Sequence, residues 1–328
     1  MARARKKAVE LEATDDRVRK PIREAIAAFL NHCKSEGLKD GTISKYRNSL
    51  EKLEDFCEAS EIDTLDEIGT ESLDRFRGGR RLRQITASKE LEILRVFFRF
   101  CLDRKWVTEN PAKRIKLPRN LKPNDVVPFT PSEIAAMLKA CETFGKSQYE
   151  RLRARAILLT LRYTALRIGD VSLLARDRIS RDGDRWRIFL RTEKSGQPVF
   201  LPVPPDMKAA LDCAPAPLRN PDSRYFFWNG IGKEKTHKAH VDRSLRAVFK
   251  ASGVQGAHAH RFRHTLATEL LGRGASFEDV ADILGNSPEI VRRHYGKWSA
   301  ARQSRIDDLM QRVYVGTDYA VREETRVQ

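Results

Sequence analysis

The chain has 328 residues, in which 62 lysines and arginines outnumber 45 aspartates and glutamates, giving a formal net charge of +17. This length is enough for two domains with sizeable cores. A basic excess of this size favours a polyanionic partner, most often nucleic acid, over a charge that serves only solubility. No apolar run approaches the length of a membrane span, and the first residues lack the apolar core of a signal peptide.

The sequence also lacks the usual marks of a metal site or a bound cofactor. Its five cysteines are scattered without a C-x-x-C pair, at Cys33, Cys57, Cys101, Cys141 and Cys213. This scatter predicts that the cysteines are reduced and serve as small apolar residues of a cytoplasmic protein. It does not indicate a zinc site or a disulfide framework. There is no P-loop, no dinucleotide-binding fingerprint and no carboxylate pair at metal-binding spacing. We therefore expect neither a cofactor nor a metal.

Amphipathic helices are predicted throughout the first third of the chain. Residues 1–18 alternate basic and acidic clusters, which is typical of a flexible arm. Apolar residues then recur at helical spacing, with breaks at glycines and at Asn110-Pro111. The predicted helices cover residues 21–37, 41–56, 70–78 and 87–104. This part of the chain should form an all-helical domain.

Basic residues gather at the end of this helical region. They outnumber acidic residues between Arg80 and Arg119. A solvated basic face is the ordinary explanation for such a cluster, and a phosphate-binding face is the alternative that the net charge supports. As a group, five side chains are expected near DNA phosphates: Arg80, Arg81, Arg83, Lys89 and Arg95.

A linker and the start of a second helical region follow. Residues 117–130 hold three prolines and show no helical period, which predicts an interdomain linker. Thr130-Pro131-Ser132-Glu133 then has the form of a capping box that opens a helix. The next predicted helix, residues 149–163, runs into T-A-L-R-I-G-D. Arg167 and Asp170 lie three residues apart there, which alone would indicate no more than an ion pair.

A β-hairpin is predicted in the middle of the second region. Residues 184–192 alternate apolar and basic side chains, and residues 197–203 return as a second strand. The tight turn between them places Lys194 at the tip. Helices are expected at residues 202–211 and 241–251. His237 and His240 would precede the second of these as surface side chains.

The segment from residue 258 to residue 298 is the most distinctive part of the sequence. His260 and Arg263 are three residues apart at a predicted helix start, so both can face one site. Ser276 is predicted to cap the next helix, which Gly285 ends. Asn286 follows directly, and a further short helix carries Tyr295, which looks exposed.

One last helix is predicted at residues 302–313. Its apolar stripe consists of Ile306, Leu309, Met310 and Val313. The stripe could pack in its own domain or against a neighbouring subunit.

Together these motifs resemble the tyrosine recombinase (phage integrase) family. That family carries T-G-L-R with a carboxylate three residues later, His-x-x-Arg, Leu-Gly-His and a nucleophilic tyrosine, in this order. Two positions depart from the pattern, since Ala165 replaces the usual glycine and Asn286 stands where histidine or tryptophan is usual. The resemblance covers about residues 20–312.

The resemblance implies a mainly α fold with a small β-hairpin or sheet. A helical, SAM-like core-binding domain should precede a tyrosine-recombinase catalytic domain. The expected boundaries are a basic arm at 1–18, the core DNA-binding domain at 19–117, a linker at 118–130, the catalytic domain at 131–313 and a tail at 314–328.

The implied reaction is site-specific DNA strand exchange through a 3′-phosphotyrosine, without metal or ATP. Two guanidinium groups would neutralise the phosphate, a histidine would assist the tyrosine and a lysine would protonate the leaving oxygen. The implied catalytic residues are Arg167, Lys194, His260, Arg263, Asn286 and Tyr295, with Asp170 as a buried supporting carboxylate.

Double-stranded DNA is the implied partner, with a monomer in solution and a homotetramer on DNA. The resemblance also allows accessory DNA-bending proteins, and it implies a cytoplasmic, nucleoid-associated protein. Phage integration, transposition and chromosome resolution all fit. Two alternatives use parts of the same machinery: DNA relaxation like that of a type IB topoisomerase, and a catalytically silent DNA-binding protein.

Overall fold

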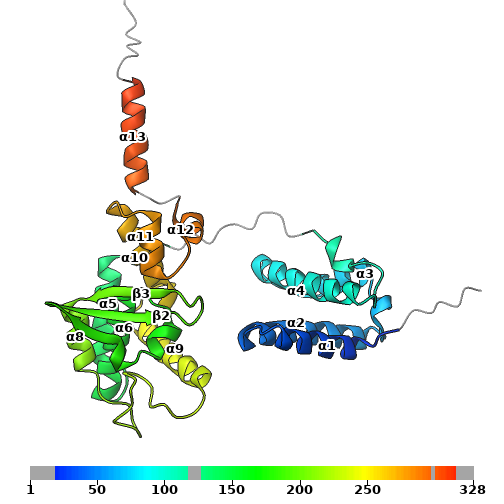
Figure 1. Cartoon of the computed structure of the whole chain (residues 1–328), viewed down its shortest axis with the longest axis horizontal. Helices are drawn as coiled ribbons and strands as arrows, with labels where there is room; N and C mark the ends of the chain where they lie inside the picture. The colour runs from blue at the N-terminus through cyan, green and yellow to red at the C-terminus, as the bar shows by residue number, and fades with distance from the viewer. Residues whose placement is uncertain (1–18, 117–126, 297–299, 315–328) are drawn as a thin grey trace, which may run out of the picture. The chain divides into compact units, whose positions relative to one another are not determined.

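The computed structural model describes residues 19–116, 127–296 and 300–314 (Figure 1). The chain divides into two compact units, residues 1–124 and 125–328. The expected arm at 1–18 lies outside the described residues. So do residues 118–126 of the expected linker and residues 315–328 of the expected tail.

Within residues 19–116 the fold is helical, as predicted. The helices are α1 (Ile22–Ser35), α2 (Asp40–Ala59), α3 (Thr70–Gly78) and α4 (Gln84–Asp103), with single 3₁₀ turns at Leu65–Glu67 and Pro111–Lys113. Helix α4 begins three residues earlier than predicted. Aromatic rings fill the centre, where Phe29 packs edge-on against Phe97 and Phe100. These rings are buried together with leucine and isoleucine side chains, and this burial of apolar surface stabilises the unit.

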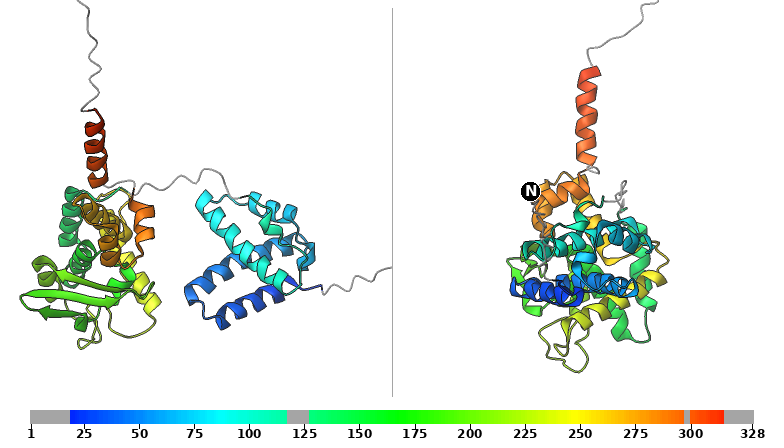
Figure 2. Two further views of the ribbon diagram at one scale, coloured as in Figure 1. Left: turned by 45° about the horizontal axis from the view of Figure 1, so that its top comes forward. Right: turned by 90° about the vertical axis from the view of Figure 1, so that its right-hand side faces the viewer.

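The second unit combines helices with one small sheet (Figure 2). Its helices are α5 (Pro131–Thr143), α6 (Gln148–Thr164), α7 (Ile168–Ser172), α8 (Pro205–Asp212), α9 (Glu234–Ala251), α10 (Ala259–Gly272), α11 (Phe277–Leu284), α12 (Pro288–Tyr295) and α13 (Ala300–Tyr314). The predicted capping boxes are present: Thr130 caps α5 with Glu133, and Ser276 caps α11 with Asp279.

The sheet is antiparallel, with strand order β1-β2-β3. The predicted hairpin is formed by β2 (Arg185–Arg191) and β3 (Pro198–Val203), and β1 (Ile179–Asp182) is an added edge strand that the sequence analysis missed. Ile188 and Leu201 pair across the hairpin and face the core. The helix predicted from residue 202 begins only at Pro205, because residues 202 and 203 complete β3.

Two segments differ from prediction in ways that matter for packing. Helix α9 begins seven residues before residue 241, so His237 and His240 lie within it. His240 is exposed, but His237 is half-buried with Nε2 3.2 Å from the carbonyl oxygen of Ser172, so it is not a surface histidine. Phe129, which lies in the expected linker, packs in the core of the second unit against Phe262.

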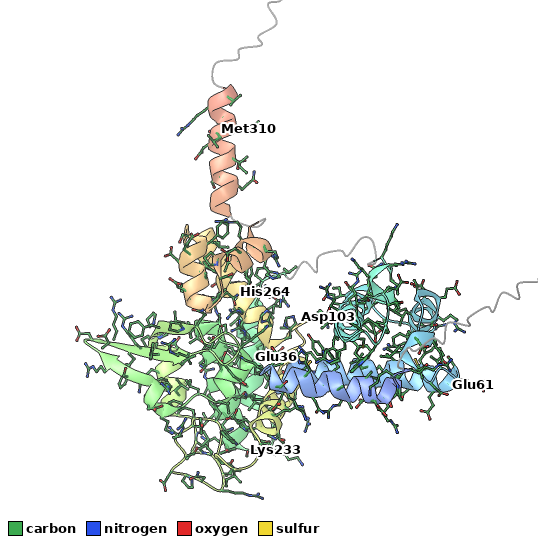
Figure 3. All side chains as sticks on the ribbon, turned by 45° about the vertical axis from the view of Figure 1, so that its right-hand side comes forward. Glu36, Glu61, Asp103, Lys233, His264 and Met310 are labelled. Carbon is green, nitrogen blue, oxygen red and sulfur yellow. The ribbon has the colours of Figure 1, made fainter. Side chains whose placement is uncertain are left out.

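Helix α13 presents its apolar stripe to solvent. Figure 3 shows the helix with Met310 labelled, and Met310 is 43% exposed. Its stripe partners Ile306, Leu309 and Val313 are also exposed. These four side chains are thus exposed, although α13 contacts α10 of its own unit. Among the described residues, no helix is long and apolar enough to cross a membrane.

Candidate active site

The first wall of the site is the sharp bend between α6 and α7. Helix α6 ends at Ala165, whose φ of 51° is left-handed. A residue with a Cβ atom is strained in this conformation, which explains why glycine is usual here. Arg167 follows two residues later as the N-cap of α7. The bend thus leaves the carbonyl of Ala165 available to Arg263 and places Arg167 where it donates to Asn286.

Arg263 comes from the first turns of α10. His258 begins this helix by accepting the backbone N–H of Arg261 at Nδ1, 3.1 Å away. Arg263 is only 2% exposed, and its guanidinium donates to the carbonyl oxygens of Ala165 (3.0 Å) and Leu284. Burial lowers the pKa of Arg263 to about 10, and the nearby charge of Arg167 contributes. It remains a cation at neutral pH.

The segment 284–286 forms the opposite wall. Gly285 ends α11 with a φ of 57°, and a Cβ atom there would lie 3.1 Å from the side chains of Thr192 and Val199. Glycine is therefore favoured for two reasons, its positive φ and the close approach of the hairpin. The Oδ1 atom of Asn286 accepts from Nη2 of Arg167 at 2.9 Å. Because a guanidinium only donates, this contact uses the amide oxygen, and within the described part of the chain the amide nitrogen of Asn286 keeps its two donors for another group.

Tyr295 is the last residue of α12. It is 6% exposed, so the expectation that it looks exposed is wrong. Its ring packs in a small apolar cluster with Ala267, Leu271 and Val291. Burial raises the pKa of Tyr295, and the charge of Arg263 opposes that rise. The hydroxyl is therefore protonated at neutral pH before any partner acts on it.

Two histidines lie between the arginines and the tyrosine. The rings of His260 and His264 are perpendicular with centroids 4.8 Å apart, and the His264 ring centroid is 5.4 Å from that of Tyr295. Burial is the main reason that the pKa of each imidazole is lowered to about 4, and the next largest cause is the charge of His264 for His260 and the charge of His258 for His264. Both rings are neutral at pH 7. His264 was missed, although its spacing of four residues from His260 places it on the same helix face.

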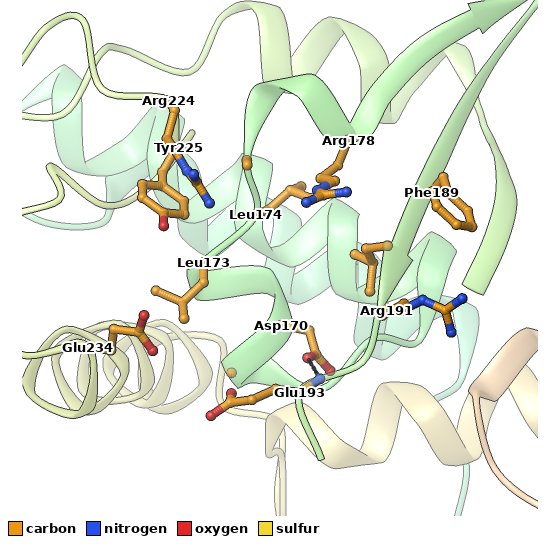
Figure 4. A pocket seen from close by; sticks show the side chains of 13 residues that line it. Asp170, Leu173, Leu174, Arg178, Phe189, Arg191, Glu193, Arg224, Tyr225 and Glu234 are labelled. Atoms are coloured by element: carbon orange, nitrogen blue, oxygen red, sulfur yellow. Dashed lines mark hydrogen bonds between the residues drawn. The ribbon is translucent and has the colours of Figure 1, made fainter. Parts of the chain in front are cut away.

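Asp170 supports the site from behind. It is 8% exposed, and its Oδ1 atom accepts the backbone N–H of Glu193 at 2.9 Å (Figure 4). Burial raises the pKa of Asp170, and this N–H and the charge of Arg167 oppose the rise. Within the described residues, Oδ2 of Asp170 and Nη1 of Arg167 are buried without a hydrogen-bond partner. An unpaired buried guanidinium nitrogen is a donor available to an anion.

All six predicted catalytic residues line the same cavity, whose volume is about 780 Å³. They come from five separate parts of the chain: the α6–α7 bend, the hairpin turn, α10, the end of α11 and the end of α12. The sequence analysis missed other lining residues, namely Ser195, Gln197, His264, Asp282, Ser287, Pro288, Ile290, Arg293 and His294. Most of these are sequence neighbours of the motif residues, which is the signal that could have found them.

The cavity wall is rich in cations. Arg167, Arg263, Arg293 and Lys194 contribute to it, against one lining carboxylate from Asp282. Within the described residues, no group of three or more His, Cys, Asp or Glu side chains could hold a metal ion. The site is therefore built to bind an anion with cationic and neutral side chains.

The five basic residues that were expected near DNA phosphates differ in what their side chains contact. Arg80 pairs with the buried Glu90 and lies over the ring of Phe76, 4.9 Å from its centroid. Arg95 donates to the carbonyl oxygens of two residues, Ala112 (3.2 Å) and Ile115 (2.6 Å). Arg81, Arg83 and Lys89 are exposed. These last three are the members whose charges face solvent.

Comparison with known proteins relates this geometry to a family. A model of the phage integrase family matches residues 128–301, and a model of the phage integrase SAM-like domain matches residues 24–117. The tyrosine recombinase XerC of Pelobacter propionicus is 27% identical over 303 residues, which cover 88% of this chain and 95% of the relative.

Two solved structures share the fold. One is a lambda integrase dimer bound to a COC′ core site, with a TM-score of 0.66 and 16% identity, covering 84% of this chain and 77% of that one. The other is a lambda integrase tetramer bound to a Holliday junction, with a TM-score of 0.65 and 17% identity, covering 84% of this chain and 80% of that one. The chain belongs to the phage integrase family of tyrosine recombinases, enzymes that cleave and rejoin DNA strands in site-specific recombination.

Proposed function

We propose that this chain cleaves DNA by attack of the Tyr295 hydroxyl on a backbone phosphorus atom. The new bond joins the tyrosine oxygen to phosphorus, and the bond from phosphorus to the 5′ oxygen breaks. The products are a 3′-phosphotyrosine and a free 5′ hydroxyl. Attack by a 5′ hydroxyl from another strand reverses these steps and reseals the DNA. The observation that carries the proposal is the single cavity lined by all six motif residues.

The two arginines would neutralise the phosphate during this reaction. Arg263 is fixed by two carbonyl oxygens, and Arg167 by Asn286, so both are oriented before DNA arrives. Guanidinium groups present planar forks of donors that match phosphate oxygens. Orienting them in advance lowers the cost of stabilising charge in the transition state. The free amide hydrogens of Asn286 are a third source of donors to a phosphate oxygen.

Proton transfers need a base and an acid. Because burial raises the pKa of Tyr295, its hydroxyl requires a proton acceptor at neutral pH. A neutral His260 can accept that proton or a hydrogen bond from the hydroxyl. Lys194 lines the same cavity and can donate a proton to the departing 5′ oxygen. Asp170 supports both the phosphate-binding arginines and the acid, since it lies near Arg167 and accepts a hydrogen bond from the backbone next to Lys194.

The expected partners are double-stranded DNA of the nucleoid and further copies of this chain. We propose that the helical unit and the catalytic unit each contact the duplex, and that the enzyme is monomeric when free and tetrameric on DNA. The exposed stripe of α13 supports an intersubunit contact, since four apolar side chains on one helix are otherwise left in water. This assembly favours strand exchange over DNA relaxation by a single subunit. Accessory DNA-bending proteins remain an expectation.

A strand-exchange assay tests this function. Two copies of the DNA site that the protein selects from a library of random duplexes would be placed on one supercoiled plasmid and incubated with the protein. Recombination should yield two circles or an inverted segment, and a truncation after Ser299 should lose this activity while single-site binding persists. Relaxed plasmid with no exchanged product would identify a topoisomerase-like activity instead. Binding without any strand cleavage would identify a silent DNA-binding protein.

A further inference from the structure

Three consecutive residues at the end of α11, residues 284–286, each accept a hydrogen bond from a different part of the cavity wall. The carbonyl of Leu284 accepts from Arg263, the carbonyl of Gly285 from Ser195, and the side-chain oxygen of Asn286 from Arg167. Two of these donors are the cavity arginines. The third is the residue directly after Lys194. Residues 284–286 therefore tie both guanidinium groups and the lysine turn to one short segment.

The direction of the hydrogen bonds at Ser195 is fixed by its single hydroxyl proton. Its Oγ atom lies 3.0 Å from the carbonyl oxygen of Gly285 and 2.7 Å from Oγ1 of Thr192. A carbonyl oxygen can only accept, so Ser195 donates to Gly285. Thr192 must then donate to Ser195. The single hydroxyl proton of Ser195 is thus used on Gly285, in a chain of hydrogen bonds that runs from Thr192, directly after β2, to the end of α11.

Packing holds the turn against residues 284–286 as well. Thr192 is 2% exposed, and its methyl group and that of Val199 occupy the space that a side chain at Gly285 would need. Two backbone hydrogen bonds close the turn itself, between Thr192 and Gln197 (2.9 Å) and between Gly196 and Thr192 (2.8 Å). The base of the turn is therefore rigid, and its position relative to α11 is set by close contact.

Glu193, the residue before Lys194, is held by contacts with α7 and α9. The backbone N–H of Glu193 donates to Asp170, as Figure 4 shows. The carboxylate of Glu193 pairs with Lys238 of α9 at 2.6 Å. Lys194 thus lies between one neighbour fixed to Asp170 and another fixed to Gly285. A lysine side chain has four rotatable bonds, so its reach is decided by where these two neighbours place its backbone.

We propose that Ser195 is a positioning residue, whose hydrogen bond to Gly285 sets the place of Lys194 relative to a phosphate held by the two arginines. This inference rests on the proposed role of Lys194 as the acid. Ser195→Ala removes the tie to Gly285 but leaves the bonds of both arginines intact. Proton delivery should slow about five- to tenfold, the expected effect of one neutral hydrogen bond. Charge neutralisation at the phosphate should not change.

The experiment uses the full chain and a nicked suicide duplex built from the DNA site that the protein selects from a library of random duplexes. Single-turnover cleavage would be measured on two versions of it, with an ordinary 5′ oxygen or a 5′-bridging sulfur at the scissile phosphate. Sulfur leaves without protonation, so it removes the need for the acid. The proteins are the wild type, Ser195→Ala, Ser195→Thr and Lys194→Ala. Ser180→Ala, an exposed serine on β1 of the same sheet, is the matched control.

The expected pattern separates the inference from the proposed function. Ser195→Ala should be slow on oxygen and within twofold of the wild type on sulfur. Ser195→Thr, which keeps a hydroxyl, and Ser180→Ala should be close to the wild type on both. Lys194→Ala should lose about 10²-fold or more on oxygen and recover on sulfur.

Each other result overturns one of the two proposals. If Lys194→Ala fails to recover on sulfur, the acid assignment is wrong and the proposal for Ser195 falls with it. If Lys194→Ala recovers but Ser195→Ala is slow on both substrates, Ser195 acts on the phosphate-binding residues and the inference is wrong. A Ser195→Ala enzyme as fast as the wild type on oxygen would also overturn it.

Discussion

The arginines of the helical unit and those of the catalytic cavity are used in different ways. In the helical unit, Arg80 is neutralised by Glu90 and Arg95 joins α4 to the end of its own unit. In the cavity, Arg167 and Arg263 are close enough that the charge of one lowers the pKa of the other. Within the described residues, both donate to uncharged oxygens of protein groups and neither pairs with a carboxylate.

This difference shows how a basic protein separates structural charge from functional charge. Placing two cations together in a half-closed cavity is unfavourable by itself, because each one disfavours the charged form of the other. An arriving phosphate relieves that repulsion, whereas a resident carboxylate would compete with it. The neutral state of the nearby histidines avoids adding further positive charge. The following predictions test this contrast, from the largest expected effect to the smallest.

Removing a cavity arginine should have the largest effect on cleavage. Arg263→Ala should slow single-turnover cleavage at saturating DNA by about 10³–10⁵, the effect of removing an arginine that stabilises a transferring phosphoryl group. Arg95→Ala is the matched control in the helical unit. It should lower the thermal unfolding temperature but leave the cleavage rate at saturating DNA within a few-fold. If Arg263→Ala and Arg95→Ala lost the same cleavage rate, the proposed difference between cavity arginines and structural arginines would be wrong.

Asn286 should matter next, because it both orients Arg167 and keeps two donors free. Asn286→Ala should cost about 10²–10³ in cleavage rate, as loss of one preorganised donor does. Asn286→His should retain much of the activity, and DNA affinity should hardly change in either variant. Single-turnover kinetics of the three proteins would decide the point. If Asn286→Ala cleaved as fast as the wild type, Asn286 would have no role in catalysis and would only help to end helix α11.

Within the helical unit, replacing Arg80 should affect stability, whereas replacing Arg81 should affect DNA binding. Arg80→Ala leaves Glu90, whose side chain is 8% exposed, buried without its cation. It should lower the free energy of unfolding by about 1–3 kcal/mol. Arg81→Ala should change stability by less than about 0.5 kcal/mol. Instead it should reduce the slope of log affinity against log salt by about 0.9, if Arg81 contacts one phosphate. Denaturant unfolding measures the change in stability, and DNA binding measured over a range of salt concentrations gives the slope.

The smallest effect concerns acid stability. The pKa of His237 falls from 6.5 to about 4, chiefly through burial, so the folded state binds fewer protons than the unfolded state between these values. Its contribution to stability is therefore complete above about pH 6.5 and is lost as pH falls toward 4. His237→Gln should reduce the drop in unfolding temperature between pH 7 and pH 5 by about 2–4 °C. If the unfolding temperature falls by the same amount in both proteins, the folded and unfolded states bind the same number of protons at His237 between pH 7 and pH 5. The pKa of His237 would then not be lowered in the folded state.

Much of this molecule is predictable from local patterns. The helices of the first unit, the capping boxes and the hairpin follow from side-chain periodicity and turn residues, and the structure confirms them. The fold class and family that the motifs implied are also confirmed. Periodicity failed at β1, a four-residue edge strand with one partly buried residue, and at the start of α9, where charged residues carry no apolar signal.

The arrangement of the site was less predictable, because it depends on distant backbone groups. The sequence gives no sign that Arg263 donates to Ala165 and Leu284, or that Ser195 reaches Gly285. Tyr295 was expected to be exposed. Its burial arises from a cluster that α10, α11 and α12 complete together. Likewise, no local pattern distinguishes Arg80 from Arg81, since the partner of Arg80 lies ten residues away on α4.

The most direct test of the central claim is Tyr295→Phe. The variant keeps the buried ring and the cavity arginines and lacks only the hydroxyl oxygen that would form the bond to phosphorus. Both proteins would be incubated with the nicked suicide duplex and run on a denaturing gel. The wild type should give a covalent protein–DNA adduct, whereas Tyr295→Phe should give none while binding the duplex with similar affinity. An adduct of unchanged yield in Tyr295→Phe would contradict the assignment of Tyr295 as the nucleophile.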